Sequence, residues 1–247
     1  MQRLGIDVGG SGIKGALVDT KTGELLTERQ RIPTPEPSKP KAVARVFNKI
    51  IDHFGWKGPI GVGFPAPILN GYTKMAANVD DEWLNFPAEE YLSKKTGRAV
   101  TMINDADAAG LAEMRFGAGK GQKGIVVVIT IGTGLGTVLF SDGVLVPNTE
   151  LGHIEVRGKD AEVRASDAAR KRKDMSWKTW GKHFDEYLCT LEKLLWPDMF
   201  ILGGGGSKKL KNFKKYLTVQ AKVVPAEFLN EAGIVGAALA VVEKSST

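Results

Sequence analysis

Two segments of the chain share one local pattern, and this pattern constrains the fold most. Each consists of an apolar run, a glycine-rich turn and a second apolar run. The first spans residues 3–20 around Gly9-Gly10-Ser11-Gly12, and the second spans residues 125–140 around Gly132-Thr133-Gly134-Leu135-Gly136. Apolar runs joined by glycine-rich turns are typical of β-hairpins. Because the two units lie about 120 residues apart, we expect two similar halves with a cleft between them.

The rest of the chain alternates between strands and helices, which predicts an α/β fold. Residues 24–31 are expected to add a third strand to the first hairpin, and a proline-rich connector follows at residues 33–40. Residues 65–85 are expected to be irregular. Apolar periodicity then predicts strands at residues 59–64, 99–103 and 199–202, and helices at residues 42–54, 87–96, 106–116, 177–195 and 230–242.

Length and composition exclude several classes of protein. The chain has 247 residues, of which 43% are hydrophobic, so it forms one large domain or two small ones. It contains no apolar run of about 18 residues, as a membrane-spanning helix requires. Asp7 follows the N-terminus too closely for the apolar stretch of a signal peptide, so we expect a cytoplasmic protein. A single cysteine, Cys189, excludes a multi-cysteine zinc site.

The net charge of +6 is concentrated in the C-terminal half. Residues 157–183 hold nine Lys or Arg and four Asp or Glu, and residues 207–222 hold six Lys and no acidic residue. At helical spacing, one face of the second segment carries Lys208, Lys211 and Lys215, and the first segment contains Arg170-Lys171. Such a local excess indicates a polyanionic partner or, alternatively, a solvated surface.

The first glycine-rich turn has the residue types of a phosphate site. The glycines of Gly9-Gly10-Ser11-Gly12 allow backbone N–H groups to face an anion. Asp7 is placed to hold a hydrated Mg²⁺, and Lys14 is placed to neutralise phosphate charge. The alternative is an ordinary hairpin in which Asp7 and Lys14 are solvated.

Two further glycine-rich turns follow apolar strands. Thr133 and Gly134 lie in the second, and the third is Gly203-Gly204-Gly205-Gly206. Four consecutive glycines lose much backbone entropy on folding, so we expect a ligand or another backbone to approach the third turn closely. An ordinary glycine hairpin remains the alternative for the second turn.

Polar residues suited to catalysis and polyol binding lie outside these turns. Asp105 stands where a strand meets a helix, and its carboxylate can accept a proton from an attacking hydroxyl, whereas Asp107 is the expected cap or solvated residue. Glu150 and His153, followed by Glu162, suit hydrogen bonding to sugar hydroxyls. A metal site built from one His and several Glu is the competing interpretation.

In their order along the chain, the motifs resemble those of the actin-like sugar kinases, and more narrowly those of the ROK family (repressors, open reading frames, kinases). The motifs are Asp7–Lys14, Asn104-Asp105, Gly132–Gly136, Glu150–His153 and the turn at Gly203. The segment Asn104-Asp105-Ala106-Asp107-Ala108-Ala109-Gly110-Leu111-Ala112-Glu113 resembles most closely the polyphosphate glucokinase branch of that family. The resemblance spans essentially the whole chain.

The resemblance implies two ribonuclease-H-like, actin-like domains with an interdomain cleft that holds sugar and phosphoryl donor. We expect a small domain of residues 1–103 with the C-terminal helix 230–247, and a large domain of residues 104–229. It further implies that Asp105 is the general base on the glucose 6-hydroxyl. The sugar would be held by Asp105 together with Asn78, Asn104, Glu150, His153 and Glu162. The transferred phosphate would be flanked by Gly9, Gly10, Ser11, Gly12, Thr133 and Gly134.

The donor and the cofactor follow from the same resemblance and from the charge pattern. We expect Mg²⁺, with Asp7 as a ligand through water, and no zinc, because the family's cysteine cluster after the Gly-His pair is missing here. We expect polyphosphate as the donor, with ATP use left open. The donor would contact Gly203, Gly204, Gly205, Lys208, Lys211, Lys215, Arg170 and Lys171.

Two other functions stay open from the sequence alone. One is an ATP-dependent kinase of another hexose, because the same glutamate and histidine residues serve several hydroxyl patterns. The other is a non-catalytic sugar- or nucleic-acid-binding protein on the same fold. The complete set of phosphate turns and the aspartate at the base position argue against the second, so we expect no nucleic-acid partner. Because the chain has no apolar run of membrane-spanning length, we also expect no membrane partner. The family resemblance also implies a homodimer.

Overall fold

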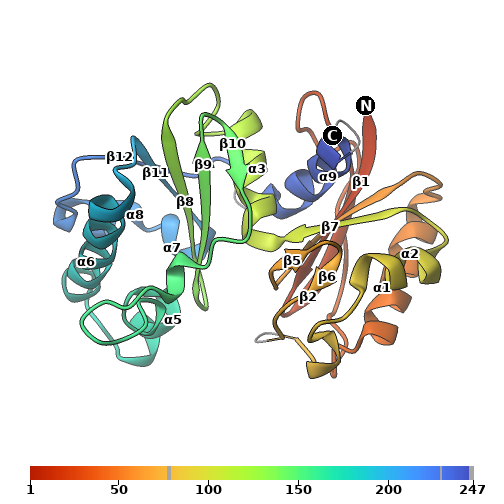
Figure 1. The fold of residues 1–247 in the computed structure, drawn as a ribbon, viewed down its shortest axis with the longest axis horizontal. Helices are drawn as coiled ribbons and strands as arrows, with labels where there is room; N and C mark the ends of the chain where they lie inside the picture. Colours follow the sequence, from red (N-terminus) through yellow and green to blue (C-terminus); the bar gives the residue numbers. More distant parts are fainter. Residues whose placement is uncertain (77–78, 229, 245–247) are drawn as a thin grey trace. The chain divides into compact units, whose positions relative to one another are not determined.

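The computed structural model describes residues 1–76, 79–228 and 230–244. The chain forms two compact units. The first unit comprises Met1–Ala112 and the segment from Glu231 onward, and the second unit comprises Glu113–Asn230. Each unit contains one five-stranded mixed sheet, so the predicted α/β class is confirmed (Figure 1).

The sheet of the first unit has the strand order β3-β2-β1-β4-β7. Antiparallel pairing joins β1 to β2 and β2 to β3, whereas β4 and β7 run parallel to β1. The strands are β1 (Gln2–Gly9), β2 (Gly12–Asp19), β3 (Gln30–Ile32), β4 (Ile60–Phe64) and β7 (Val100–Asn104). Around them lie α1 (Pro40–Phe54), α2 (Ala88–Thr96), α3 (Asp105–Phe116), α9 (Ala232–Lys244), the short strands β5 (Ile68–Leu69) and β6 (Tyr72–Thr73), and the 3-10 turn η1 (Asp81–Trp83).

Glycines let α9 lie directly on the first sheet. A Cβ atom at Gly5 or Gly61 would overlap the carbonyl oxygen of Ile234 or Ala237 in α9. On the neighbouring strand β2, a Cβ atom at Gly15 would come within 2.7 Å of Ile50 in α1. Since Gly5 and the Ile6–Gly15 pair are one residue apart along β1, these contacts lie on opposite faces of the sheet. Helices therefore cover both faces, as a buried parallel core requires.

The sheet of the second unit has the strand order β10-β9-β8-β11-β12. Its strands are β8 (Ile125–Ile131), β9 (Leu135–Ser141), β10 (Val144–Val146), β11 (Met199–Gly203) and β12 (Lys222–Pro225). The helical segments are η2 (Leu151–His153), α4 (Glu162–Ala165), α5 (Asp167–Arg172), α6 (Trp177–Leu195), α7 (Gly204–Ser207), α8 (Leu210–Phe213) and η3 (Lys214–Tyr216). The buried face of α6 packs through Trp180 and Phe184 against Phe213 of α8.

A buried carboxylate ties the end of α3 to the segment before α9. Glu113 is 1% exposed and accepts hydrogen bonds from the backbone N–H groups of Ala118, Glu227 and Phe228. These part-buried backbone donors and the buried carboxylate satisfy one another, and a buried carboxylate without partners would be energetically costly. Glu113 therefore has a structural role in the second unit.

The structure corrects two predicted elements. The third strand covers only Gln30–Ile32 rather than residues 24–31, because the Thr27 hydroxyl replaces a backbone carbonyl as the acceptor for the Leu17 N–H. Residues 65–85 are not wholly irregular, since β5 and β6 pair around a turn in which Asn70 and Gly71 both have positive φ. Such a two-residue turn is the usual connection of a tight hairpin.

Candidate active site residues in the two units

The first unit gathers its candidate residues at one edge of its sheet. Strands β1, β4 and β7 are parallel, so their carboxyl ends meet at that edge. Asp7 pairs in register with Gly63, and Gly63 pairs with Ile103, the residue before Asn104. Two strand spacings, about 10 Å, therefore separate the backbone of Asp7 from that of Ile103, two residues before α3 begins at Asp105.

Asp7 is enclosed by β2 and the start of α9. Lys14 Nζ lies 3.3 Å from its Oδ2 atom, and a Cβ atom at Gly233 would come within 2.8 Å of its Oδ1 atom. Desolvation by these neighbours raises the pKa of Asp7, and the charge of Lys14 opposes part of that rise. The carboxylate oxygen atoms of Asp7 are the type of ligand that a hydrated divalent metal prefers.

The β1–β2 turn is held from outside by two side chains. Arg31 donates from Nη2 to the Ser11 carbonyl at 2.8 Å, and the Thr34 hydroxyl donates to the Gly9 carbonyl at 2.6 Å. Gly12 lies so close to Arg31 that a Cβ atom would meet the guanidinium at 2.7 Å, whereas a Cβ atom at Gly10 would have no atom within 4 Å. The open space at Gly10 leaves the turn accessible to a ligand.

A cavity of about 450 Å³ adjoins this turn within the first unit. Its walls are Gly9 and Gly10, the proline-rich connector at residues 34–38, Phe64-Pro65, and Val79-Asp80. Its volume is in the range of small-molecule sites. Asn78, predicted to bind sugar, lies outside the described residues.

The residue that caps the N-terminus of α3 differs from the sequence-based prediction. The Asn104 Oδ1 atom accepts the N–H groups of Ala106 and Asp107 at 2.9 and 3.1 Å, so Asn104 is the capping residue. Asp107, predicted as the cap or a solvated residue, is instead 1% exposed. Asp105 is half-buried at the first position of the helix, and its Oδ1 atom accepts the Ala106 N–H at 2.8 Å.

The second unit brings its two glycine-rich turns to one edge. Strands β8 and β11 are parallel, and Gly203 pairs in register with Thr130. Gly204 has a φ of 74°, and a Cβ atom there would come within 2.6 Å of the Ile131 carbonyl oxygen. The expected close approach of another backbone is therefore confirmed at Gly204, while Gly204–Ser207 forms the short helix α7. Gly205 and Gly132 each have open space at the Cβ position.

The segment around Glu150 and His153 is anchored to β9. The hydroxyl groups of Thr137 and Thr149 each donate to the other residue's carbonyl at 2.9 Å, and the Leu151 N–H donates to Thr137 Oγ1 at 2.8 Å. Gly152 packs so tightly that a Cβ atom would overlap the Leu135 carbonyl oxygen. Glu150 and His153 are thereby fixed beside the Thr133–Gly134 turn.

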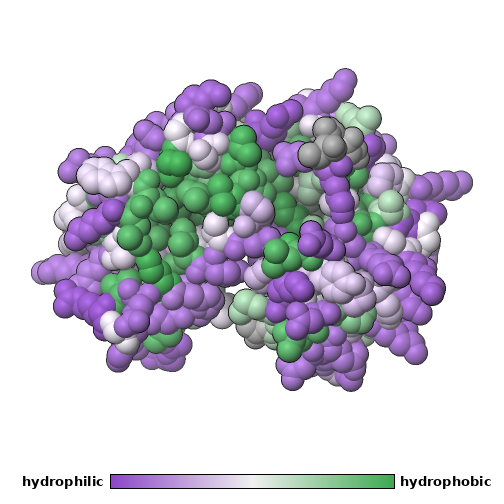
Figure 2. All heavy atoms as spheres, viewed as in Figure 1, coloured by the Kyte–Doolittle hydropathy of each residue, from purple (hydrophilic) through white to green (hydrophobic). Residues whose placement is uncertain are grey.

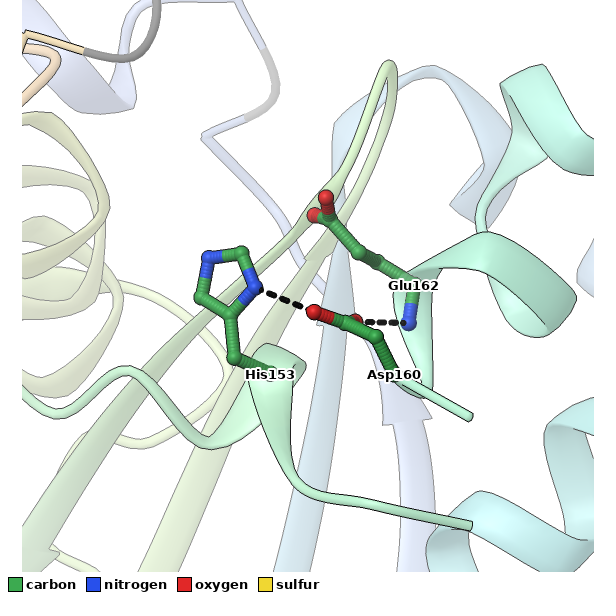
Figure 3. Close-up of side chains that lie close together, drawn as sticks. All are labelled: His153, Asp160 and Glu162. Atoms are coloured by element: carbon green, nitrogen blue, oxygen red, sulfur yellow. Dashed lines mark hydrogen bonds and ion pairs between the residues drawn. The ribbon is translucent and has the colours of Figure 1, made fainter. Parts of the chain in front are cut away.

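Three polar side chains converge in this part of the second unit (Figure 3). Asp160 Oδ2 lies 2.7 Å from His153 Nδ1, and Asp160 Oδ1 accepts the Glu162 N–H at 3.1 Å. The Glu162 Oε2 atom accepts the Leu135 N–H at 3.3 Å, which links it to the β8–β9 turn. Asp160 was missed from the sequence, where it stands in a charged stretch with no motif around it.

The charges in this cluster influence one another. Hydrogen bonding to Asp160 raises the pKa of His153, and the carboxylates of Glu162 and Glu150 act in the same direction. Desolvation raises the pKa of Glu150, whose Oε2 atom lies 3.9 Å from His153 Nε2. The ligand-type atoms of His153, Asp160 and Glu162 lie within 4.8 Å of one another. Because Asp160 already engages the Nδ1 atom, we interpret the group as a hydrogen-bonded cluster.

The predicted donor-binding cations occupy two places in the second unit. Lys208 follows α7, Lys211 lies in α8 and Lys215 lies in η3, and all three are exposed. Arg170 and Lys171 of α5 both contact Asp167, at 3.2 and 2.8 Å. Asp167 thus offsets part of the α5 charge, and Arg170 also lies over the Trp177 ring at 4.2 Å.

Among the described residues, no helix combines the length and the apolar character needed to cross a membrane.

Comparisons with known proteins agree with this geometry. The family model described as "ROK family" matches residues 3–170. A polyphosphate glucokinase of Mycobacterium tuberculosis (strain CDC 1551 / Oshkosh) is 47% identical over 238 residues, which cover 96% of this chain and 90% of that protein. The crystal structure of an inorganic polyphosphate/ATP-glucomannokinase from Arthrobacter sp. strain KM superposes with a TM-score of 0.93 at 46% identity, covering 98% of this chain and 99% of the other.

A more distant solved structure shares the fold. It is a ROK family glucokinase from Streptomyces griseus in complex with glucose and AMPPNP, with a TM-score of 0.80, 24% identity and coverage of 96% and 98%. The family model spans more than half of the chain, and the Mycobacterium relative covers nearly all of it. The chain therefore belongs to the ROK family.

Proposed function

We propose that this protein transfers a phosphoryl group from inorganic polyphosphate to the 6-hydroxyl of glucose, giving glucose 6-phosphate. The observation that carries this proposal is the 47% identity with a polyphosphate glucokinase over 96% of the chain. The Arthrobacter relative is named for both polyphosphate and ATP and for both glucose and mannose. That name favours ATP as a second donor and mannose as a second acceptor for this chain.

Asp105 is the proposed general base. It accepts the proton of the 6-hydroxyl while the oxygen forms a bond to the terminal phosphorus of the donor, and the bond from that phosphorus to the bridging oxygen breaks. Polyphosphate leaves one phosphate shorter, and ATP leaves as ADP. Such transfer depends mainly on positioning and on neutralising charge, and base assistance contributes about 10²- to 10⁴-fold.

The sugar is proposed to bind through Asn104 and Asp105 of the first unit and through Glu150, His153 and Glu162 of the second. Asn78 belongs to the same proposal. The cavity beside Gly9 and Gly10 has the volume for a sugar-sized ligand at the edge where β1 and β4 end, although Asn104 and Asp105 are not among its lining residues. Carboxylate, amide and imidazole groups provide both donors and acceptors for hydroxyls.

The transferred phosphate is proposed to lie between Gly9-Gly10-Ser11-Gly12 with Lys14 and the turn containing Thr133 and Gly134. Asp7 is proposed to hold Mg²⁺ through water, because carboxylate oxygen atoms are the hard ligands that Mg²⁺ prefers. Bound Mg²⁺ would offset the negative charge of the donor phosphates.

The donor is proposed to extend from Gly203, Gly204 and Gly205 across the cationic surface of the second unit. Lys208, Lys211 and Lys215 follow the third turn directly, and Arg170 and Lys171 add charge on α5. Figure 2 shows hydrophilic residues at the edge of the second unit where α5 and α6 lie, beside hydrophobic residues over its sheet. A polyanion fits such a surface by releasing bound counterions, as nucleic acids do.

The arrangement of the parts is proposed from the family. The two units would be the two ribonuclease-H-like, actin-like domains, divided near residues 103 and 230, with the substrates between them and a homodimer as the assembly.

The test is an assay of glucose 6-phosphate formation by the purified protein with Mg²⁺ and either long-chain polyphosphate or ATP. We expect turnover with polyphosphate above that with ATP. Turnover with ATP alone would reject polyphosphate as the donor. Folded protein without turnover on glucose or mannose would reject the kinase and favour a binding protein. In that case nucleic-acid binding at physiological salt is the next measurement.

A further inference from the structure

Asp160 lies between two residues that the proposed function assigns to the sugar. One of its oxygen atoms lies 2.7 Å from His153 Nδ1, and the other accepts the backbone N–H of Glu162 at 3.1 Å (Figure 3). His153 belongs to η2 and Glu162 to α4, so one carboxylate joins two separate segments.

The chain brings Asp160 back to His153 by a tight turn. Val156 and Lys159 exchange backbone hydrogen bonds at 2.8 and 3.3 Å, and Arg157 and Gly158 between them have φ values of 54° and 71°. Two residues of positive φ form the hairpin turn that matches strand twist. The bridge between Glu155 and Asp160 completes the turn and places Asp160 beside the histidine.

The contact determines which nitrogen of His153 carries the proton. An ionised carboxylate only accepts hydrogen bonds, so His153 Nδ1 must donate to Asp160. The neutral imidazole then leaves Nε2 as an acceptor, on the side where Glu150 Oε2 lies 3.9 Å away. Within the described part of the second unit, the charged groups that act on the ring are Asp160, Glu150 and Glu162.

We propose that Asp160 is the positioning residue of the sugar site. It holds His153 in the Nδ1–H tautomer with Nε2 available to the ligand, and it holds the backbone from which the Glu162 carboxylate projects. Asp160 acts through these two residues. The inference rests on the proposed sugar role of His153 and Glu162.

The tautomer is measured directly by ¹⁵N NMR of the histidine side chains. The chain has three histidines, His53, His153 and His183, so a His153→Gln sample identifies the signal. We expect Nδ1 of His153 to carry the proton in the neutral form and its pKa to lie above the ordinary value of about 6.5. A neutral form protonated at Nε2 would overturn the proposal without any variant at Asp160.

Asp160→Asn removes the charge while keeping the shape of the side chain. The pKa of His153 should fall, because the imidazolium loses the anion that stabilises it. Glu155→Gln is the matched control: it removes the negative charge of the exposed residue that pairs with Asp160 across the same turn but is not among the charges that act on His153, so it should leave the His153 titration in place. An unchanged titration in Asp160→Asn would overturn the proposal.

Kinetics then separate positioning from general damage. In Asp160→Asn we expect the KM for glucose to rise about tenfold, with its pH inflection moved to lower pH, and the KM for polyphosphate to change less than about twofold. Equal increases in the KM for glucose and the KM for polyphosphate would contradict a role of Asp160 that is confined to the sugar site. If the wild-type protein forms no glucose 6-phosphate, the proposed function fails, whereas the NMR titration still decides whether Asp160 orients His153.

Discussion

Glu162 is oriented by two neighbours of different kinds. Its backbone N–H donates to Asp160, and its Oε2 atom accepts the Leu135 N–H at 3.3 Å. The second contact depends on a glycine at position 134, since a Cβ atom there would overlap the same carboxylate oxygen. The glycine of the β8–β9 turn therefore has a role in placing a proposed sugar ligand as well as in forming the turn.

Gly134→Ala should move the Glu162 carboxylate. We expect the KM for glucose to rise about five- to tenfold, because a charged hydrogen-bond partner is displaced, while the melting temperature changes by less than about 4 °C. The matched variant is Gly132→Ala in the same turn, where the added Cβ atom has no neighbour within 4 Å. A glucose KM unchanged in Gly134→Ala, or raised equally in both variants, would contradict this account.

At the residue scale, the sequence predicts which residues belong to the candidate site better than it predicts their hydrogen-bond partners. Asn104 and Asp105 stand out because a strand must end and a helix must begin there, yet either Asn104 or Asp107 satisfies the rules for a cap. The structure assigns the cap to Asn104 and buries Asp107. The residues around Asp160 in the sequence do not indicate its role, because the Arg157-Gly158 turn is what brings it beside its partner His153.

At the scale of elements, each glycine-rich turn contains at least one glycine that protein packing does not require. A Cβ atom at Gly10, Gly132 or Gly205 would have no neighbour within 4 Å, whereas one at Gly206 would meet Ile131 at 2.5 Å. None of the three needs positive φ. We therefore interpret these three positions as places where a ligand, and not the protein, excludes a side chain.

Alanine at Gly10, Gly132 or Gly205 should separate binding from folding. We expect the KM for the phosphoryl donor to rise about tenfold in each variant, with the free energy of unfolding changed by less than about 1 kcal/mol. Gly206→Ala should instead destabilise the fold by about 1–3 kcal/mol through overpacking against Ile131. Urea denaturation and donor titrations provide both values. If the donor KM were unchanged in all three variants, the proposal that these turns bind the donor phosphates would be contradicted.

The elements themselves were largely predictable. The two hairpins follow from apolar runs interrupted by glycine, and the helices follow from periodic apolar residues such as those of α1 and α6. The predicted strand 24–31 was too long because a side chain of Thr27 takes over backbone pairing. The hairpin at Asn70-Gly71 was missed although the dipeptide is a strong turn signal, because its strands have only two residues each.

At the scale of the whole molecule, charge is distributed unevenly between the two units. Both cationic segments, residues 157–183 and 207–222, lie in the second unit. The α5 cations share Asp167, whereas Lys208, Lys211 and Lys215 are exposed. The lysines after α7 are thus the stronger candidates for contacts with a polymeric donor.

Replacing Lys208, Lys211 and Lys215 together by Gln should weaken polyphosphate use selectively. We expect the KM for polyphosphate to rise and its dependence on salt to become shallower, by about 0.7 in logarithmic slope for each lost contact. The KM for ATP should change little. The control replaces three lysines of the first unit, Lys41, Lys49 and Lys57. If the two triple variants raised the KM for polyphosphate equally, the effect would come from the total charge of the protein and not from a donor-binding surface.

The central claim is that Asp105 removes the proton of the sugar hydroxyl during transfer from polyphosphate. The most direct measurement is the kcat of Asp105→Asn with glucose and polyphosphate, on protein whose melting temperature matches that of the wild type. The account predicts a fall of about 10²- to 10⁴-fold in kcat, with a similar fall when ATP is the donor, because the base serves the acceptor and not the donor. Turnover within about threefold of the wild type would contradict it.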